Sequence, residues 1–178
     1  MSFNDLAARR YSVRKFSQQE VEQEKLDYVL RAGQLSPTAV NYQPQRILVI
    51  NDREGRAKLR ECTDYHFNAP VSLLVCSRNA EAWTRPFDGQ NSGVIDCSIV
   101  TTQMMLAAAD IGLGTTWIMY YDPKKLREAF EIPASLEPVA LLVMGYPADD
   151  AAPGPKHAQR KAIEETVFYN AFPPEVGG

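Results

Sequence analysis

The sequence predicts an α+β fold in which helices surround a central sheet within one domain, residues 1–178. Three observations predict it. The chain has 178 residues, 45% of them apolar, which is enough for one well-filled core and too little for two. Short apolar runs of strand length alternate with longer segments of helical periodicity. No internal repeat or linker interrupts this order, so a single domain follows.

Two helices are predicted in the first third of the chain. The first begins with a capping box, in which Ser17 is the N-cap and Glu20 reaches back to it. Apolar residues then recur at helical spacing up to Gly33, which supplies a stop. Asp52 begins a second, charged helix that runs to about residue 60 on the surface.

Four apolar runs of strand length are expected to form the sheet, and they comprise residues 46–50, 70–76, 115–119 and 138–144. A helix over residues 94–111 is apolar almost all round, which is typical of a central, buried element, and Gly112 ends it. Asp122 followed by Pro123 places an N-cap and an N1 proline at the start of another helix. Residues 78–93 are polar and are expected to form an irregular, exposed loop.

Composition excludes several function classes. The net charge of −3 provides no broad positive field for nucleic acid or an anionic membrane. The longest uncharged apolar-rich stretch, residues 97–109, is shorter than the roughly 20 residues of a membrane span, and the N-terminus lacks a secretory signal. Three widely spaced cysteines and two histidines support neither a disulfide framework nor a metal site. We therefore expect a cytoplasmic protein without a metal.

The segment after Pro147, residues 148–178, is predicted to be an arm, because it is too polar to build a core alone. Its apolar residues are Ile163, Val167, Phe168, Tyr169 and Phe172. Burial of such side chains contributes roughly 1.5–3 kcal/mol each, whereas exposure would leave an apolar patch. Exchange of the arm between two copies of the chain would cover it. The alternative is an arm that folds back on its own domain.

A candidate anion site lies near the N-terminus, where Arg10, Ser12 and Arg14 alternate along an expected extended segment. Alternation directs the three side chains to one side. Two guanidinium groups and a hydroxyl suit a phosphate monoester, because each guanidinium can donate two charge-assisted hydrogen bonds. The alternative is a solvated basic terminus. Nucleotide-binding glycine motifs and catalytic triads are absent from the sequence.

Four segments in order resemble motifs of the nitroreductase family of FMN-dependent oxidoreductases. They are Arg10-x-Ser12-x-Arg14, residues 35–44 (LSPTAVNYQP), residues 112–115 (GLGT) and residues 160–165 (RKAIEE). The resemblance extends from about Leu6 to about Tyr169. It implies a nitroreductase-like fold with a mostly antiparallel or mixed sheet, and a homodimer with exchanged arms and two FMN molecules at its interface.

The resemblance also implies roles for individual residues. Arg10, Ser12, Arg14 and Arg160 would hold the ribityl and phosphate part of FMN, and the other subunit would contribute Pro37, Thr38, Ala39 and Asn41. The segment packing on the flavin ring would comprise Trp117, Ile118, Met119 and Tyr120, with a backbone N–H of Met119 or Tyr120 near flavin N5. The chemistry belongs to the flavin, so no catalytic side chain is required.

The implied activity is a ping-pong transfer of hydride from NADH or NADPH, through FMN, to a nitroaromatic, a quinone or a similar small acceptor. Two alternatives stay open at this point. One is a specialised flavin enzyme, such as a reductive dehalogenase or a flavin-consuming enzyme. The other is a non-catalytic FMN-binding protein, which would bind flavin without being reduced by a nicotinamide.

The sequence departs from the family pattern at several positions. Many relatives carry Glu-Gly where this chain has Met119-Tyr120, and Gln45 replaces an aromatic residue. Residues 83–87 are a candidate substrate-side lid, with ordinary packing of a long loop as the alternative. Asp96 stands on the apolar helix, where an interface salt bridge is expected and acceptance from backbone donors is the alternative.

Overall fold

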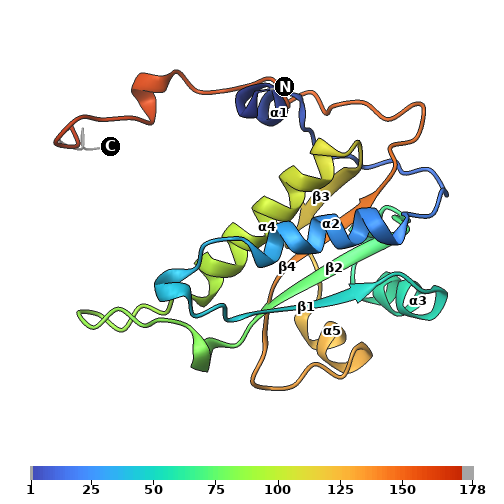
Figure 1. Ribbon diagram of the computed structural model, residues 1–178, viewed down its shortest axis with the longest axis horizontal. Helices are drawn as coiled ribbons and strands as arrows, with labels where there is room; N and C mark the ends of the chain where they lie inside the picture. The colour runs from blue at the N-terminus through green and yellow to red at the C-terminus, as the bar shows by residue number, and fades with distance from the viewer. Residues whose placement is uncertain (1, 174–178) are drawn as a thin grey trace.

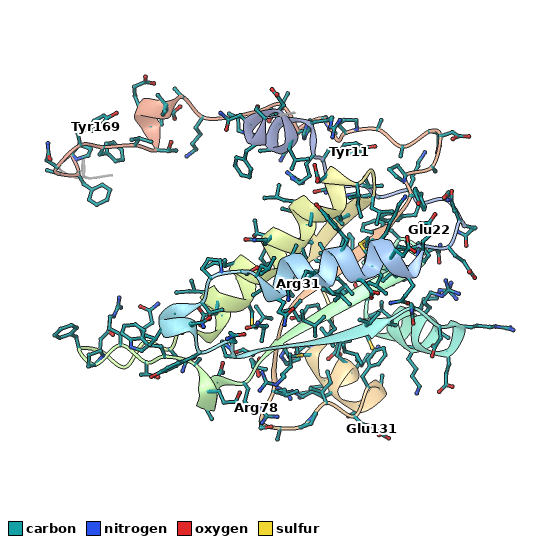
Figure 2. All side chains as sticks on the ribbon, viewed as in Figure 1. Tyr11, Glu22, Arg31, Arg78, Glu131 and Tyr169 are labelled. Carbon is teal, nitrogen blue, oxygen red and sulfur yellow. The ribbon has the colours of Figure 1, made fainter. Side chains whose placement is uncertain are left out.

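The computed structural model describes residues 2–173 and has the predicted α+β architecture around one four-stranded sheet (Figure 1). The strands are β1 (Gln45–Ile50), β2 (Val71–Ser77), β3 (Gly114–Ile118) and β4 (Glu137–Gly145). Their order is β1-β2-β4-β3, and every neighbouring pair is antiparallel. The central strands β2 and β4 are buried on both faces, and each contains an apolar run, residues 73–76 in β2 and residues 138–144 in β4.

Helices cover both faces of the sheet. On one face lie α2 (Gln23–Gln34) and α4 (Gly93–Asp110), and on the other lie α3 (Arg53–Cys62) and α5 (Pro123–Ala129), as Figure 1 shows. Asp52 caps α3 by accepting from the Gly55 N–H, and Asp122 caps α5 ahead of its N1 proline, as the sequence predicts. The two cores are separated by the sheet, with Leu73 facing α4 and Leu74 facing α3 and α5.

The start and end of the first predicted helix are wrong. Residue Ser17 caps no helix, because the chain around it is extended and its N–H donates to the Tyr146 carbonyl at 2.9 Å. The helix α2 begins after Glu22 instead. Gly33 lies inside its last turn, where an added Cβ would come within 2.8 Å of Met104 on α4. This glycine therefore serves the close packing of α2 on α4 rather than the helix stop.

A short N-terminal helix, α1 (Phe3–Arg9), is an element that the sequence analysis missed. Its capping box joins the Ser2 hydroxyl to the Asp5 N–H and the Asp5 carboxylate to the Ser2 N–H. The pattern Ser-x-x-Asp is a helix-start signal, but the seven residues that follow are too few to show a period.

The predicted helix over residues 94–111 is present as α4, but only part of its surface is buried. Cys97, Val100, Met104 and Ala108 are fully enclosed against the sheet and α2. Another face is apolar and exposed, with Val94 and Ile95 each 52% accessible and Ile99 37%. Gly112 ends the helix in the left-handed region, at a φ of 82°.

The loop before α4 and the predicted arm both lie outside the packed body. Thr84 and Asn91 form an isolated antiparallel bridge, so the loop has a narrow, hairpin-like tip. The arm after Pro147 is drawn in orange and red in Figure 1, where it passes α1 in this view and then extends away from the sheet. No helix among residues 2–173 is long and apolar enough to cross a membrane. Residues 174–178 of the predicted arm lie outside the described part of the chain.

Candidate functional site

The segment that carries Arg10, Ser12 and Arg14 runs beside β3, the edge strand of the sheet. Ser12 forms a parallel bridge with Thr115, and the Val13 N–H donates to the Thr115 carbonyl at 2.9 Å. This single parallel bridge is the one departure from an otherwise antiparallel arrangement among the described residues. Gly114 permits the approach, because an added Cβ there would lie 2.5 Å from a Val13 methyl group.

A strongly basic cavity of about 610 Å³ lies between this segment and the first part of the arm. Its lining residues are Arg10, Ser12, Arg14, Gly154, Pro155, Lys156, His157 and Arg160. Five of them have basic side chains and none is acidic, so the cavity suits an anion with several oxygens. The structure therefore brings together all four residues that the sequence analysis assigned to the phosphate.

Two of these guanidinium groups are held by backbone carbonyls near them in the chain. Arg14 donates to the Ser12 carbonyl at 3.2 Å, and Arg160 donates to the carbonyls of His157 and Gln159 at 2.6 and 2.7 Å. Within residues 2–173, neither arginine forms an ion pair with a carboxylate. Their charges are therefore not neutralised by the protein itself.

A second cleft, of about 470 Å³, opens where β3 ends. Met119 and Tyr120 lie at its edge with exposed side chains, and the Tyr120 ring contacts Tyr65 edge to face with the ring centres 5.1 Å apart. The Thr63 hydroxyl donates to the Tyr120 carbonyl. Among the hydrogen bonds of the described residues, none has the Tyr120 N–H as its donor. This N–H therefore has no acceptor within the described part of the chain.

The preceding strand residues have little side-chain surface to offer. Ile118 is buried among the residues that α3 and α5 cover, and Trp117 is half-buried on the α4 side. The Trp117 indole N–H is buried and has no partner within the described residues. Any contact of Ile118 with a ligand along β3 would therefore use its backbone.

The loop that carries Pro37, Thr38, Ala39 and Asn41 lies at the other end of α4. The Ala39 N–H donates at 2.8 Å to the carboxylate of Asp96 in the first turn of that helix. The basic cavity is at the opposite end, because Arg10 also lines a pocket with Asp110 and Gly112. Asp110 lies fourteen positions after Asp96 on this helix, a rise of about 21 Å. One chain therefore holds its two candidate flavin-binding segments far apart.

The expectation of an interface salt bridge at Asp96 is wrong. This carboxylate is buried, and it accepts from the Ala39 N–H and from the Ser92 hydroxyl at 2.7 Å. No lysine, arginine or histidine within residues 2–173 pairs with it. The alternative, acceptance from a backbone donor, is the arrangement present.

All three cysteines are buried and have a structural environment. Burial raises the pKa of Cys97 to about 12 and that of Cys76 to about 11, so neither is a thiolate at neutral pH. Burial likewise raises the pKa of Cys62. In the described part of the chain, no three His, Cys, Asp or Glu side chains are grouped to hold a metal ion. Acid–base or nucleophilic chemistry by these groups is therefore not indicated.

Several site residues escaped the sequence analysis. Lys156 and His157 line the basic cavity, and they were not predicted because they lie about 140 residues after Arg14 in a segment without periodicity. Thr63 meets Tyr120 across 57 positions. A local pattern cannot show pairings of this separation, and only the fold brings these residues together.

Comparisons with known proteins agree with this architecture. The sequence model of the Nitroreductase family matches residues 7–64 and 63–146 of this chain. A Methanothermobacter thermautotrophicus protein whose assigned name is NADH dehydrogenase/NAD(P)H nitroreductase is 32% identical over 148 residues, covering 79% of this chain and 75% of that one. The Bacillus subtilis FMN reductase (NAD(P)H) is 28% identical over 177 residues, covering 89% of this chain and 71% of the relative.

The solved structures include a close match. A nitroreductase family protein of Clostridium difficile superposes with a TM-score of 0.91 and 41% sequence identity, covering 97% of this chain and 100% of that one. The chain therefore belongs to the nitroreductase family, and it is an oxidoreductase of that family.

Proposed function

We propose that this oxidoreductase is a homodimer that holds two FMN molecules and transfers hydride from NADH or NADPH to small acceptors such as nitroaromatics or quinones. The observation that carries the proposal is the basic cavity at the start of β3, which contains Arg10, Ser12, Arg14 and Arg160 and no acidic side chain. The names of the relatives, which include an FMN reductase and an NAD(P)H nitroreductase, support the same cofactors.

The residues present fit FMN. The cavity supplies charge-assisted donors for a phosphate, and β3 leads from it towards the cleft at Met119 and Tyr120. Thr115 to Met119 spans about 13 Å of extended chain, which suits an elongated cofactor. Bound FMN would supply the hydride-accepting ring. The unpartnered N–H of Tyr120 would then donate to the ring, while Thr63 fixes the neighbouring carbonyl.

A dimer formed along α4 would bring together the two candidate flavin-binding segments that lie at opposite ends of this helix. A two-fold axis perpendicular to α4 would pair the exposed faces of two α4 helices in an antiparallel arrangement, so each N-terminal end would meet the partner's C-terminal end. Each loop with Pro37, Thr38, Ala39 and Asn41 would then approach the basic cavity of the other subunit. The exposed apolar residues of α4 and of the arm supply area for such an interface.

The cleft at the end of β3 would take the nicotinamide and the acceptor in turn. It is open, and the exposed Met119 and Tyr120 side chains leave room for planar substrates of different shape. The hairpin tip with Phe87, whose side chain is 93% exposed, is the candidate lid. A general reductase is favoured over a dehalogenase, because the cleft is open and the names of the relatives above are those of reductases.

The direct test is the flavin content of purified, FMN-supplemented protein. We expect flavin absorbance with about one FMN per chain, bleaching under anaerobic NADH or NADPH, and reoxidation by a quinone or a nitroaromatic. The double variant Arg10→Ala/Arg160→Ala should weaken FMN binding at least about 100-fold, because charged hydrogen bonds contribute roughly 1.5–3 kcal/mol each.

The matched control is Arg31→Ala/Arg53→Ala, which removes two arginines outside the cavity. Its FMN dissociation constant should equal that of the wild type. Protein that binds no FMN would refute the proposed function. Protein that binds FMN but is reduced by neither nicotinamide would be the non-catalytic alternative.

A further inference from the structure

A buried carboxylate, Asp96, connects the central helix to the loop that the proposed function assigns to the partner's flavin. Its side chain is 1% exposed, with Oδ1 accepting from the Ala39 N–H at 2.8 Å and Oδ2 from the Ser92 hydroxyl at 2.7 Å. It lies in the first turn of α4, where the helix dipole favours a negative charge. Burial of a carboxylate is costly unless its oxygens accept hydrogen bonds, so the loss of either of these two donors would destabilise the site.

The loop on the other side of this contact has a strained backbone. Val40, Asn41 and Gln43 have φ values of 54°, 56° and 52°, which side chains with a Cβ rarely adopt. Val40 is the most unfavourable of the three, because a β-branched residue is a genuine outlier in this region. Such strain persists only where surrounding contacts fix the conformation.

Few contacts are available to hold the backbone conformation of this loop. Most hydrogen bonds of residues 37–43 are local, such as Asn41 N–H to the Thr38 carbonyl and Gln43 N–H to the Thr38 hydroxyl. Among the described residues, the bond from Ala39 to Asp96 is the one that ties this segment to a distant part of the chain. Val40 and Tyr42 are largely exposed, so packing within the subunit adds little.

We infer that Asp96 is a positioning residue that holds the Thr38–Asn41 turn in shape for the FMN bound to the partner subunit. The inference rests on the proposed function and adds to it a residue that touches neither the cofactor nor the substrate. Because the Ala39 N–H points to Asp96, it is not free for FMN. The Thr38 hydroxyl and the Asn41 amide are then the polar groups that the turn presents.

The variant Asp96→Ala tests this role, because it leaves the Ala39 N–H and the Ser92 hydroxyl without their acceptor. We expect the FMN dissociation constant to rise roughly tenfold or more. Asp96→Asn should restore affinity to within about threefold, because its oxygen can accept from Ala39 while the Ser92 hydroxyl turns to accept from its amide. The circular dichroism of the bound flavin should change in Asp96→Ala and return in Asp96→Asn.

A matched control separates positioning from stability. Val100→Ala removes a buried side chain one turn further along α4, so it should lower the melting temperature and leave the FMN dissociation constant unchanged. Unchanged FMN affinity and flavin dichroism in Asp96→Ala would overturn the inference. Loss of affinity in Val100→Ala equal to that in Asp96→Ala would also overturn it, because stability alone would then explain both.

Mixed dimers test whether the loop acts on the partner. One chain carries Asp96→Ala and the other carries Arg10→Ala/Arg160→Ala. If the loop serves the partner, each mixed dimer then has one site with an intact loop and an intact basic cavity. We expect that site to bind FMN with wild-type affinity. If mixing restores no tight site while the wild type binds FMN, the loop serves its own subunit and the inference fails. Absence of FMN from the wild type would instead refute the proposed function.

Discussion

The two faces of α4 have the same apolar character and opposite surroundings. Residues Cys97, Val100, Met104 and Ala108 face the sheet and α2 and are fully buried, whereas Val94, Ile95 and Ile99 face outward and are accessible. Burial of an apolar side chain stabilises a fold only if a partner surface is present. The first face therefore stabilises the subunit, and the second is available to stabilise an assembly. Mutations on the first face are therefore expected to unfold the subunit, and mutations on the second face are expected to dissociate the dimer.

The largest effect is expected on the inward face. Met104→Ala should lower the free energy of unfolding by about 2–5 kcal/mol, because it opens a cavity where Gly33 allows close packing. Met105→Ala, one residue along and only partly buried, should cost clearly less. Urea denaturation of both variants would measure the difference. Equal losses would contradict the expectation that the cost of truncation on α4 follows the burial of the side chain.

The next largest effect is expected on the outward face. Ile99→Asp should raise the dimer dissociation constant by about 100-fold, since it removes an apolar contact and adds a charge at the proposed interface. The fold of the subunit should be retained, because this side chain is not part of the core. Analytical ultracentrifugation with circular dichroism measures both properties. Ile99→Val is the conservative control, and a dimer that is equally stable in Ile99→Asp would place the interface elsewhere.

The arm provides a third, smaller test. Phe168→Ser should raise the dimer dissociation constant roughly tenfold if the arm packs on the partner, since one aromatic contact would be lost. The free energy of unfolding of the subunit should then be unaffected. If the variant lowers that free energy and leaves dimerisation unchanged, the arm folds back on its own domain, which is the alternative raised from the sequence.

Much of the packed body could be predicted, because buried elements require apolar residues at positions that are recognisable in the local sequence. The strands β2 and β4 are enclosed on both faces, which produces uninterrupted runs such as Val139–Met144. The caps Asp52 and Asp122 lie within three residues of the groups they bind. In contrast, Ser17 matched a capping pattern, yet its N–H pairs with Tyr146 at the end of the sheet. Tertiary pairing overrode the local signal there.

The candidate site could be predicted only in part, because some of its residues are brought together by tertiary pairing and not by local spacing. Alternation along an extended segment was enough to place Arg10, Ser12 and Arg14 at one cavity. Ala39, which donates to Asp96, and Tyr120, which accepts from Thr63, each lie 57 positions from their partner, so no spacing rule could identify these two pairs. The exposure of one face of α4 could not be predicted either. An apolar stretch of sequence has the same pattern whether it packs on its own sheet or on another chain.

The smallest expected effect concerns pH, and it separates the subunit's stability from its assembly. His66 has a pKa below its ordinary value, because burial disfavours its charged form and Arg60 repels it, partly offset by Asp64. Its Nδ1 accepts from the Asn68 N–H at 3.0 Å, which requires that nitrogen to be unprotonated.

The sign follows from proton uptake. Below about pH 6.5 the unfolded chain takes up the His66 proton more readily than the folded chain, so stability falls as pH is lowered through that region. The variant His66→Asn keeps an acceptor for Asn68 and should flatten this part of the stability profile. Dimerisation through α4 should be the same in both proteins between pH 5.5 and 7.5, since the accessible Val94, Ile95 and Ile99 do not titrate. Parallel pH dependence in the variant would show that other groups cause the loss.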